Sequence, residues 1–280
     1  MNGFEDIIDG IAKKAAEGQE NRKTHLNEEY LLCCDICGEP IQCRIEVFDK
    51  VRTVYCMCRC EREEQQRRRD EIQQMMRDDR ISRLKVNGFD NAEMQAWTFK
   101  NDDGKQPKVI EAAKKYCEKF EDFKTDGKGI IFHGGVGTGK TFTAACIANE
   151  LISNGIPVYM TNFANIVNAL QSNYNGRQQY LEQLNKNDLL IIDDLAAERN
   201  TEYMNEIVYN VIDARYRLNL PLIVTTNISM QEMMNVTEIS RQRIYSRVLE
   251  MCHPVAVTGT DRRKQAAMKN YAEMNKILGL

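Results

Sequence analysis

The sequence lacks long apolar runs, a strong net charge, internal repeats and segments of low complexity. No apolar stretch approaches the roughly 20 residues that a membrane-spanning helix requires, so a membrane protein is not expected. A formal net charge of -3 gives no overall attraction to nucleic acid, and any such contact must come from local basic patches. The first residues lack the basic start and apolar centre of a signal peptide, and we therefore expect a cytoplasmic protein.

What the sequence contains is typical of a globular protein with one large and one small domain. Hydrophobic residues make up 42% of its 280 residues and charged residues 28%, which excludes a disordered or fibrous chain. The pattern predicts an N-terminal helix and cysteine-rich module at 1–62, a charged helical linker at 63–100 and the larger domain at 101–280. The first helix is expected from apolar residues at helical spacing between Phe4 and Ala15.

The cysteines are concentrated in one part of the chain, because seven of the ten lie between Cys33 and Cys60. In a reducing compartment such a cluster indicates metal ligation more than disulfide bonds. The cluster contains a C-x-x-C pair followed by glycine and, later, a second group of closely spaced cysteines. Four thiolates in a tetrahedral array form a closed, structural zinc site. The predicted zinc ligands are Cys34, Cys37, Cys58 and Cys60.

The ligand set of this zinc-binding module has alternatives. Cys56 could replace Cys58, and Cys33 and Cys43 are further candidates within the same cluster. A catalytic zinc is not expected, because no histidine or carboxylate at this spacing completes an open site. The metal is therefore expected to support the fold of a small N-terminal zinc-binding domain.

A strongly charged segment of mixed sign follows the cysteines, from Arg59 to Lys85. Its composition predicts a helix, which we interpret chiefly as a solvated connector. The alternative is a helix that contacts a partner or DNA. After it, the segment from Asn87 to Lys105 contains an Asp-Asp-Gly sequence and is expected to be a loop at the domain boundary.

Beyond this boundary, strand-like apolar runs alternate with helical segments, which predicts a parallel sheet with crossover helices. Strands are expected at 129–133, 157–162, 188–195 and 222–227. Helices are expected at 140–153, 163–174 and 202–218. The predicted fold class is therefore α/β, with helices flanking a parallel sheet.

A glycine-rich sequence lies between the first of these strands and the first helix, which is the context of a phosphate-binding loop (P-loop). Glycines let backbone N–H groups turn inward around phosphate oxygens, and the start of the helix adds its positive dipole end. Lys140 is expected to reach the β- and γ-phosphates of a nucleotide, and Thr141 to bind Mg²⁺ through its hydroxyl. The predicted phosphate-binding residues are Gly134, Gly135, Val136, Gly137, Thr138, Gly139, Lys140, Thr141 and Phe142.

Two acidic residues come at the end of the apolar run at 188–195, where parallel sheets bind their ligands. We expect Asp193 to bind Mg²⁺ directly or through water, and Asp194 to act as general base for an attacking water. Asn227, at the end of the next predicted strand, could hold that water near the γ-phosphate. With the glycine-rich loop, these residues predict binding and hydrolysis of ATP with Mg²⁺.

Two arginine-containing segments follow the last predicted strand. The first contains Arg243 and Arg247, and the second contains Arg262 and Arg263. An arginine offered to the γ-phosphate of a neighbouring subunit stabilises the charge that develops during phosphoryl transfer. The alternative is that these arginines lie on the solvated surface of helices and take no part in chemistry.

Over residues 100–280 the sequence resembles the AAA+ ATPases of the DnaC/IstB type. The resemblance rests on GGVGTGKT at 134–141, LLIIDDLAAE at 189–198, LIVTTN at 222–227, RIYSRVLEMCHPVAV at 243–257 and DRR at 261–263. It implies a P-loop AAA+ fold. The sequence departs from most AAA+ proteins in ending its Walker B strand with Asp-Asp instead of Asp-Glu, and in lacking a full helical lid.

The resemblance also implies a role for each candidate residue. Lys140 and Thr141 correspond to Walker A, Asp193 and Asp194 to Walker B, and Asn227 to sensor I. Arg247 corresponds to an arginine finger that acts on a neighbouring subunit, with Arg243 as the second candidate. Arg262 or Arg263 corresponds to sensor II.

The cysteine module resembles the N-terminal zinc region of Gram-positive and phage helicase loaders, including the CRCE sequence at 58–61. The resemblance implies an ATP-dependent loader that binds a replicative hexameric helicase and single-stranded DNA, and that self-associates in its ATP state. One alternative is a transposition helper ATPase, which shares the core but has less need of a zinc module. The others are an interaction protein switched by ATP and a small-molecule kinase, although Asp-Asp followed by TTN favours water as the phosphoryl acceptor.

Overall fold

The computed structural model describes residues 23–47, 50–172, 176–196 and 201–279. The chain divides into two compact units between Arg77 and Asp78. The helix predicted between Phe4 and Ala15 lies outside the described residues. Across the described ranges, no helix combines the length and apolar character needed to cross a membrane.

The first unit contains two antiparallel strand pairs. Strand β1 (Thr24–Leu26) pairs with β2 (Leu32–Cys34), and β3 (Gln42–Val47) pairs with β4 (Lys50–Tyr55). The sequence pattern indicated the cysteines of this module but not its strands. They were missed because strands of 3 or 6 residues with mixed burial show little of the regular alternation on which such a prediction depends.

A small apolar cluster forms the core of this first unit. Its buried members are Cys34, Ile41 and Cys58, with Leu32 and Tyr55 packed beside them. So small a core supplies little free energy of folding, and domains of this size usually add a disulfide bond or a structural metal. The composition of the cluster, two of whose three buried members are cysteines, points to the metal.

The charged segment after the cysteines forms one helix, α2 (Arg59–Asn87), as predicted. None of its residues is fully buried. Ion pairs one turn apart, such as Glu64 with Arg68 and Asp79 with Arg83, lie along its surface. Such pairs stabilise a helix that lacks a buried face, and the last turns of α2 pack against the core of the second unit.

The second unit contains a five-stranded parallel sheet, which confirms the predicted α/β fold class. Its strands are β5 (Gly129–His133), β6 (Val158–Asn162), β7 (Leu189–Leu195), β8 (Leu222–Thr226) and β9 (Cys252–Ala256). The order across the sheet is β6-β7-β8-β5-β9. Because all neighbouring strands are parallel, their carboxyl ends lie at one edge, where α/β sheets bind ligands.

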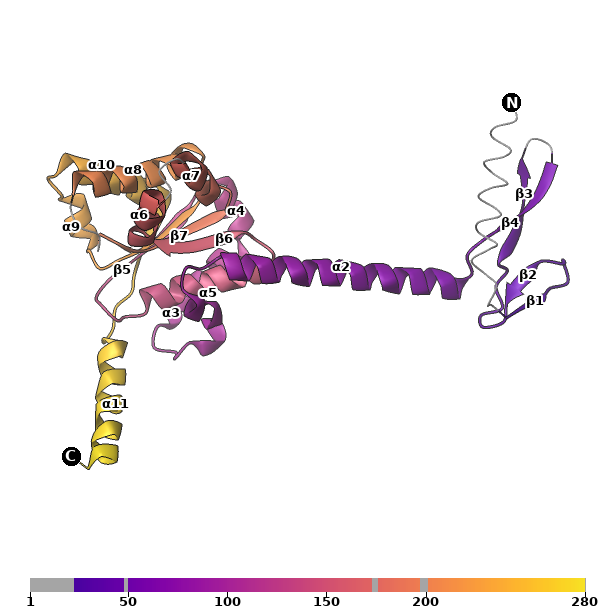
Figure 1. Ribbon diagram of the computed structural model, residues 1–280, viewed down its shortest axis with the longest axis horizontal. Helices are drawn as coiled ribbons and strands as arrows, with labels where there is room; N and C mark the ends of the chain where they lie inside the picture. Colours follow the sequence, from indigo (N-terminus) through magenta and orange to yellow (C-terminus); the bar gives the residue numbers. More distant parts are fainter. Residues whose placement is uncertain (1–22, 48–49, 173–175, 197–200, 280) are drawn as a thin grey trace. The chain divides into compact units, whose positions relative to one another are not determined.

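Helices cover both faces of this sheet (Figure 1). One core cluster joins the sheet to α3 (Pro107–Glu118) and α5 (Lys140–Ser153). The other joins it to α6 (Phe163–Ser172), α8 (Glu202–Arg217) and α10 (Ile239–Met251). The remaining helices are α4 (Phe120–Thr125), α7 (Arg177–Asn185), α9 (Met230–Met234) and α11 (Arg262–Leu278).

Strand β9 was not among the predicted strands. It contains His253 and Pro254, and proline interrupts the pattern expected of a buried strand. Among the described strands, β9 pairs with β5 alone, so it lies at the edge of the sheet, where a proline is tolerated. The four predicted strands and three predicted helices are all present, with ends that differ by at most two residues.

The segment 87–105, expected to be a loop, is packed onto the second unit instead. Phe89 is buried, and its backbone bridges to Met160 in β6. Two short 3-10 helices follow, η1 (Ala92–Ala96) and η2 (Phe99–Asn101). Asx and glycine residues in this segment suggested a turn, whereas its large side chains are what hold it against the sheet.

Arg215 in α8 is a fully buried arginine beneath this sheet, with 0% of its surface exposed. Its guanidinium donates hydrogen bonds to the carbonyl oxygens of Asn187, Asp188 and Pro221 at 2.8, 3.1 and 2.6 Å. Burial lowers the pKa of Arg215 to about 9. One side chain thus satisfies backbone groups in the two connections that precede β7 and β8.

Arg215→Met should therefore lower the melting temperature strongly. Leaving three buried carbonyl groups without donors should cost about 3–5 kcal/mol, and each kcal/mol lowers Tm by about 2–4 °C in a domain of this size. The matched control is Arg217→Met, because the Arg217 side chain is 73% exposed and Asp213 keeps its second ion pair, with Arg247. Thermal unfolding followed by circular dichroism should show the difference, and equal shifts in the two variants would contradict it.

Candidate functional site

The glycine-rich loop joins the end of β5 to the start of α5, the position predicted for it. Gly134, Gly137 and Gly139 have φ values of +147°, +73° and +104°, which residues that carry a Cβ atom rarely adopt. A Cβ at Gly134 would also lie 2.2 Å from the carbonyl oxygen of Val257. Only glycine fits here, and the resulting loop surrounds the positive end of helix α5.

Lys140 is the first residue of α5, and its ammonium group is held inside the loop. It donates hydrogen bonds to the carbonyl oxygens of Gly134 and Gly135, at 3.0 and 2.8 Å, and to Oδ1 of Asn227 at 2.7 Å. Burial lowers the pKa of Lys140, and the nearby carboxylate of Asp194 opposes this shift. Two predicted residues from separate segments, Lys140 and Asn227, are thus in direct contact.

Asp193 and Asp194 lie in β7 where its register against β8 shifts. Thr225 of β8 contacts both: its hydroxyl donates to Oδ1 of Asp193 at 2.6 Å and accepts from the backbone N–H of Asp194 at 2.9 Å. Burial raises the pKa of Asp193, and hydrogen bonds from Thr225 and Thr141 oppose the rise. Successive residues of a regular strand point to opposite faces, so this irregularity, with φ of +54° at Asp194, re-aims the second carboxylate.

These residues meet at one cavity of about 370 Å³. Of the predicted site residues, those that line it are Val136, Gly137, Gly139, Lys140, Thr141, Phe142, Asp194, Asn227, Arg262 and Arg263. Those outside its lining are Gly134, Gly135, Thr138, Asp193 and Arg247. Asp193 is nevertheless linked to the cavity, because it accepts a hydrogen bond from Thr141, which lines it.

Three residues that line the cavity were missed by the sequence reading: Trp97, Asn101 and Asp103. They lie in the segment that was expected to be a loop. The ring centroid of Trp97 is 6.2 Å from that of Phe142, so the two form an aromatic wall of the cavity. The sequence offered one weak signal, since this is the single tryptophan of the chain.

A larger cavity of about 700 Å³ lies between α3, α10 and β9. Its lining is mostly apolar, with Tyr116, Phe123 and Met251 among its residues, and it includes none of the predicted phosphate-binding residues. Size alone therefore does not identify the functional site. The backbone geometry of the loop, the buried lysine and the adjacent carboxylates favour the smaller cavity.

The first turn of α11 lies directly on the phosphate-binding loop. The backbone N–H of Arg262 donates to the carbonyl oxygen of Gly137 at 3.0 Å, and the Arg262 guanidinium pairs with Asp103 at 3.1 Å. The carboxylate of Asp261 caps α11, and a Cβ at Gly137 would lie 2.0 Å from its Oδ1. Any nucleotide in the cavity would therefore contact the beginning of this helix.

Arg243 and Arg247 of α10 do not line the nucleotide cavity of their own chain. The Arg247 guanidinium pairs with Oδ1 of Asp213 at 2.7 Å and donates to the hydroxyl of Tyr209 at 2.9 Å. Its central carbon also lies 4.6 Å from the centroid of the Tyr209 ring. Arg243, one turn earlier, is exposed. Neither arginine is placed to act on a nucleotide bound to the same chain.

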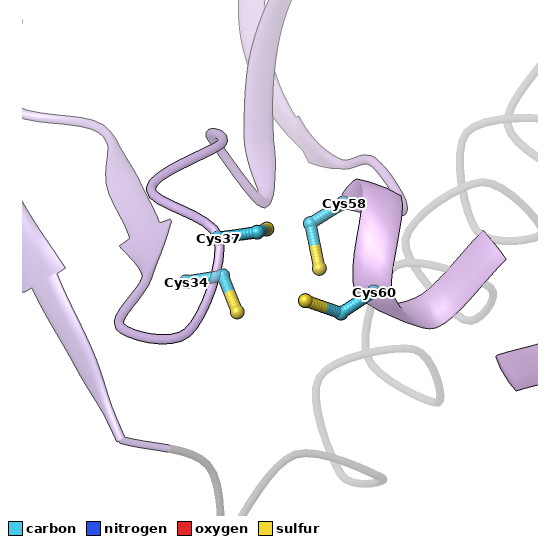
Figure 2. A group of neighbouring side chains, drawn as sticks. All are labelled: Cys34, Cys37, Cys58 and Cys60. Atoms are coloured by element: carbon cyan, nitrogen blue, oxygen red, sulfur yellow. The ribbon is translucent and has the colours of Figure 1, made fainter. Parts of the chain in front are cut away.

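A second candidate site lies in the first unit, where Cys34, Cys37, Cys58 and Cys60 point toward one another (Figure 2). Their four sulfur atoms lie within 4.8 Å of each other. Sulfur atoms in a tetrahedral zinc site with Zn–S bonds of about 2.3 Å are about 3.8 Å apart, so this group fits zinc with small adjustments. Cys34 ends β2 and Cys37 lies in the turn after it, whereas Cys58 directly precedes α2 and Cys60 lies in its first turn.

The thiols of this cluster affect one another's protonation. Backbone N–H groups of Cys60 and Glu39 lower the pKa of Cys37 to about 6. In contrast, the hydrogen bond with Cys37 raises the pKa of Cys60 to about 12, and burial raises the pKa of Cys58. The Cys56 thiol instead donates to the carbonyl oxygen of Pro40 at 3.6 Å. Within the described residues, the cysteines of the module outside the cluster are Cys33, Cys43 and Cys56.

Comparison with known proteins identifies the family. The profile of the family described as IstB-like ATP binding protein matches residues 57–270. The chain belongs to this family. The relatives include the replicative helicase loader DnaC of Escherichia coli (strain K12), which is 31% identical over 149 residues, or 51% of this chain and 58% of that protein. The replicative helicase loader DnaI of Bacillus subtilis (strain 168) is 29% identical over 151 residues, or 49% of this chain and 48% of that protein.

This IstB-like ATP-binding protein thus spans about half the length of the curated relatives it matches. A crystal structure of DnaI has a similar fold, with a TM-score of 0.52 and 25% identity, covering 64% of this chain and 99% of that one. The resemblance to the DnaC/IstB type predicted from the motifs is therefore confirmed. All residues of the nucleotide cavity lie within the family match, whereas Cys34 and Cys37 precede it.

Proposed function

We propose that this chain is an ATP-hydrolysing loader of a replicative DNA helicase, acting in the cytoplasm. The observation that carries the proposal is the meeting of Lys140, Asp194 and Asn227, from three separate segments, at one cavity beside a phosphate-binding loop. The relatives named as replicative helicase loaders suggest the client. We expect the partners to be a hexameric helicase, single-stranded DNA and further copies of this chain.

In the proposed reaction, Lys140 exchanges its contact with Asn227 for oxygens of the β- and γ-phosphates, which are stronger acceptors than an amide. Thr141 and Asp193 hold Mg²⁺, which neutralises charge on those phosphates when bound. Asp194 accepts a proton from water as the water oxygen forms its bond to the γ-phosphorus, and ADP leaves with the electrons of the broken bond. Asn227, released from Lys140, orients that water.

The proposed site is completed by an arginine from a second copy of the chain. Arg262 and Arg263 line the cavity of their own chain, which supports one of them as the sensor II residue. Arg247 is proposed as the residue that acts across the subunit boundary, with Arg243 as the next candidate. Supporting this assignment, both lie on α10 and neither lines its own nucleotide cavity.

The proposal is tested with the purified protein, the hexameric helicase of the same source and a closed circle of single-stranded DNA. We expect a complex with the helicase, ATP-dependent transfer of that helicase onto the circle, and an ATPase rate that responds to single-stranded DNA. Lack of any complex with the helicase, with ATP or without it, would remove the client from the proposal. An active ATPase without that complex would leave the enzymatic part standing.

The second candidate function is a transposition helper ATPase of the IstB type, the type for which the matching family is named. Such a protein would bind double-stranded DNA and a transposase in place of a helicase. The same ATPase assay separates the two, because stimulation by double-stranded but not single-stranded DNA would favour the helper. The four-thiol cluster in the first unit favours the loader, since the shared ATPase core does not require it.

We also propose that the thiol cluster of Cys34, Cys37, Cys58 and Cys60 holds one structural Zn²⁺. Its sulfur atoms are close enough for one ion, and the small core around them needs an additional constraint. Burial of Cys34 and Cys58 excludes solvent from two of the four ligands. A closed site of this kind stabilises the fold and does not take part in hydrolysis.

The purified protein should contain about one zinc per chain, and the variant Cys34→Ser/Cys37→Ser should contain none. The matched control is Cys33→Ser/Cys43→Ser, which removes two thiols of the same module outside the cluster and should retain zinc. Elemental analysis measures the metal, and circular dichroism with a chelator measures its effect on folding. Zinc retained by the first variant, or absent from the parent protein, would contradict the proposed site.

A further inference from the structure

A pocket of about 470 Å³ lies between the start of α8 and the start of α10, outside the nucleotide site. Its lining includes the carboxylates of Glu202 and Glu206, the rings of Tyr203 and Tyr209, and Arg243. The pocket therefore surrounds the exposed arginine of α10 with acidic and aromatic groups. We refer to it as the α8–α10 pocket.

The α8–α10 pocket has the chemistry to receive a cationic side chain with an apolar stem. Glu202 and Glu206 are exposed, and within the described residues neither has an ion pair or side-chain hydrogen bond. Tyr203 is 43% exposed, and aromatic faces attract ammonium and guanidinium groups while covering the apolar stem that carries them. The two carboxylates would supply the opposite charge.

An exposed cation follows two residues that line the nucleotide cavity, in the first turn of α11. That turn contains three consecutive basic residues. Arg262 pairs with Asp103, and Arg263 lines the nucleotide cavity. Lys264 is exposed, and among the described residues its ammonium group has no ion pair or hydrogen bond. It is therefore the basic residue of this turn that remains available to another molecule.

We infer that the α8–α10 pocket receives Lys264 from a second copy of this chain. The inference rests on the proposed function, in which an arginine of α10 acts on the nucleotide of a neighbouring copy. If α10 lies over that nucleotide, the residues beside its arginines must face those beside the neighbour's cavity. On one side two carboxylates, Glu202 and Glu206, outnumber the single cation Arg243. On the other side lies Lys264, so the two surfaces carry opposite net charge.

This contact joins two different surfaces of the chain, so each copy uses its α8–α10 pocket on one neighbour and its Lys264 on the next. Because α11 begins on the phosphate-binding loop, through Arg262 and Asp261, ATP would orient the lysine that the neighbour binds. Self-association would thereby depend on nucleotide through named residues. The contact would also hold the arginines of α10 near the γ-phosphate.

The test uses two charge reversals and their mixture. Glu206→Lys places a cation in the pocket against Lys264, and Lys264→Glu places an anion against Glu202 and Glu206. Each variant alone should self-associate about tenfold or more weakly than the parent, because like charges then face each other. In an assembly that alternates the two variants every contact pairs opposite charges, so association should return in an equimolar mixture. Sedimentation velocity with a non-hydrolysable ATP analogue measures it.

The matched controls are Glu118→Lys and Lys108→Glu, which reverse exposed charges on α3, the second of them also in the first turn of a helix. Both should associate as the parent does. Parent-like association of either test variant alone, or a mixture that stays dissociated, would overturn the inference while leaving ATP-dependent assembly intact. Loss of helicase binding with unchanged self-association would assign the pocket to the helicase and overturn it too. A parent protein that fails to associate with ATP would overturn both the inference and the proposed assembly.

Discussion

Lys140→Ala should weaken ATP binding by about 10–150-fold, the effect of losing one hydrogen-bonded charge. Asp194→Asn should bind ATP nearly as the parent does, but its rate of hydrolysis should fall by about 10²–10⁴-fold. The Lys140 ammonium lies inside the phosphate-binding loop, where it meets bound ATP in the ground state. Asp194 is needed when water attacks, so its loss appears in turnover and not in affinity.

Both variants need a preserved fold and a control for the comparison to be valid. Asparagine is as acceptable as aspartate at the positive φ of residue 194, so Asp194→Asn should keep its backbone. Lys186→Ala, an exposed lysine outside the cavity, is the control for Lys140→Ala. Titration calorimetry measures binding, and release of inorganic phosphate measures turnover. An equal loss of ATP affinity in both variants would disprove the division of roles.

The phosphate-binding loop and the strands around it could be predicted because their information is local. Each motif can be recognised within about ten residues. The phosphate-binding loop shows glycines at fixed spacing followed by a lysine, and the strand after it shows an apolar run that ends in two acids. The parallel sheet followed from the alternation of such segments. The same reasoning anticipated that Asn227 would lie near the loop, and the 2.7 Å contact of its amide with Lys140 agrees with that placement.

Other parts of the site depend on packing between segments far apart in the sequence. Trp97 and Asn101 reach the cavity because the segment before α3 folds back onto the sheet, which no local spacing indicates. The register shift at Asp193 and Asp194 depends on the Thr225 hydroxyl in the neighbouring strand. A sequence pattern shows the hydrophobic period of one helix or strand, whereas these features arise from contacts between two separate segments of the chain.

The placement of Arg247 is a further consequence of packing between helices. Sequence resemblance suggested an arginine directed at a neighbour, but not its contacts within the chain. In the structure α8 holds its guanidinium through Asp213 and Tyr209. Removing the side chain altogether would leave the Asp213 carboxylate, which is 11% exposed, with Arg217 as its remaining ion-pair partner. A test of catalysis should therefore keep the positive charge at this position.

Arg247→Lys should reduce ATP hydrolysis by about 10³-fold or more, the usual contribution of an arginine that acts in trans, while ATP binding by the isolated chain stays close to the parent value. Lysine keeps a positive charge for Asp213 but lacks the planar fork that contacts two phosphate oxygens at once. The melting temperature should consequently change little. A strongly lowered melting temperature would show that Arg247 serves the packing of α8 on α10.

The decisive measurement mixes two inactive proteins, Lys140→Ala and Arg247→Lys. An assembly that alternates them contains contacts in which the intact arginine of the first meets the intact ATP site of the second, so part of the activity should return. Arg243→Ala, tested in the same mixture in place of Arg247→Lys, is the matched comparison one turn away on α10. If the Arg247→Lys mixture stays inactive, whereas Arg243→Ala is inactive alone and recovers when mixed, the arginine that crosses the subunit boundary is Arg243, and the Asp213 pair of Arg247 is a structural contact between helices.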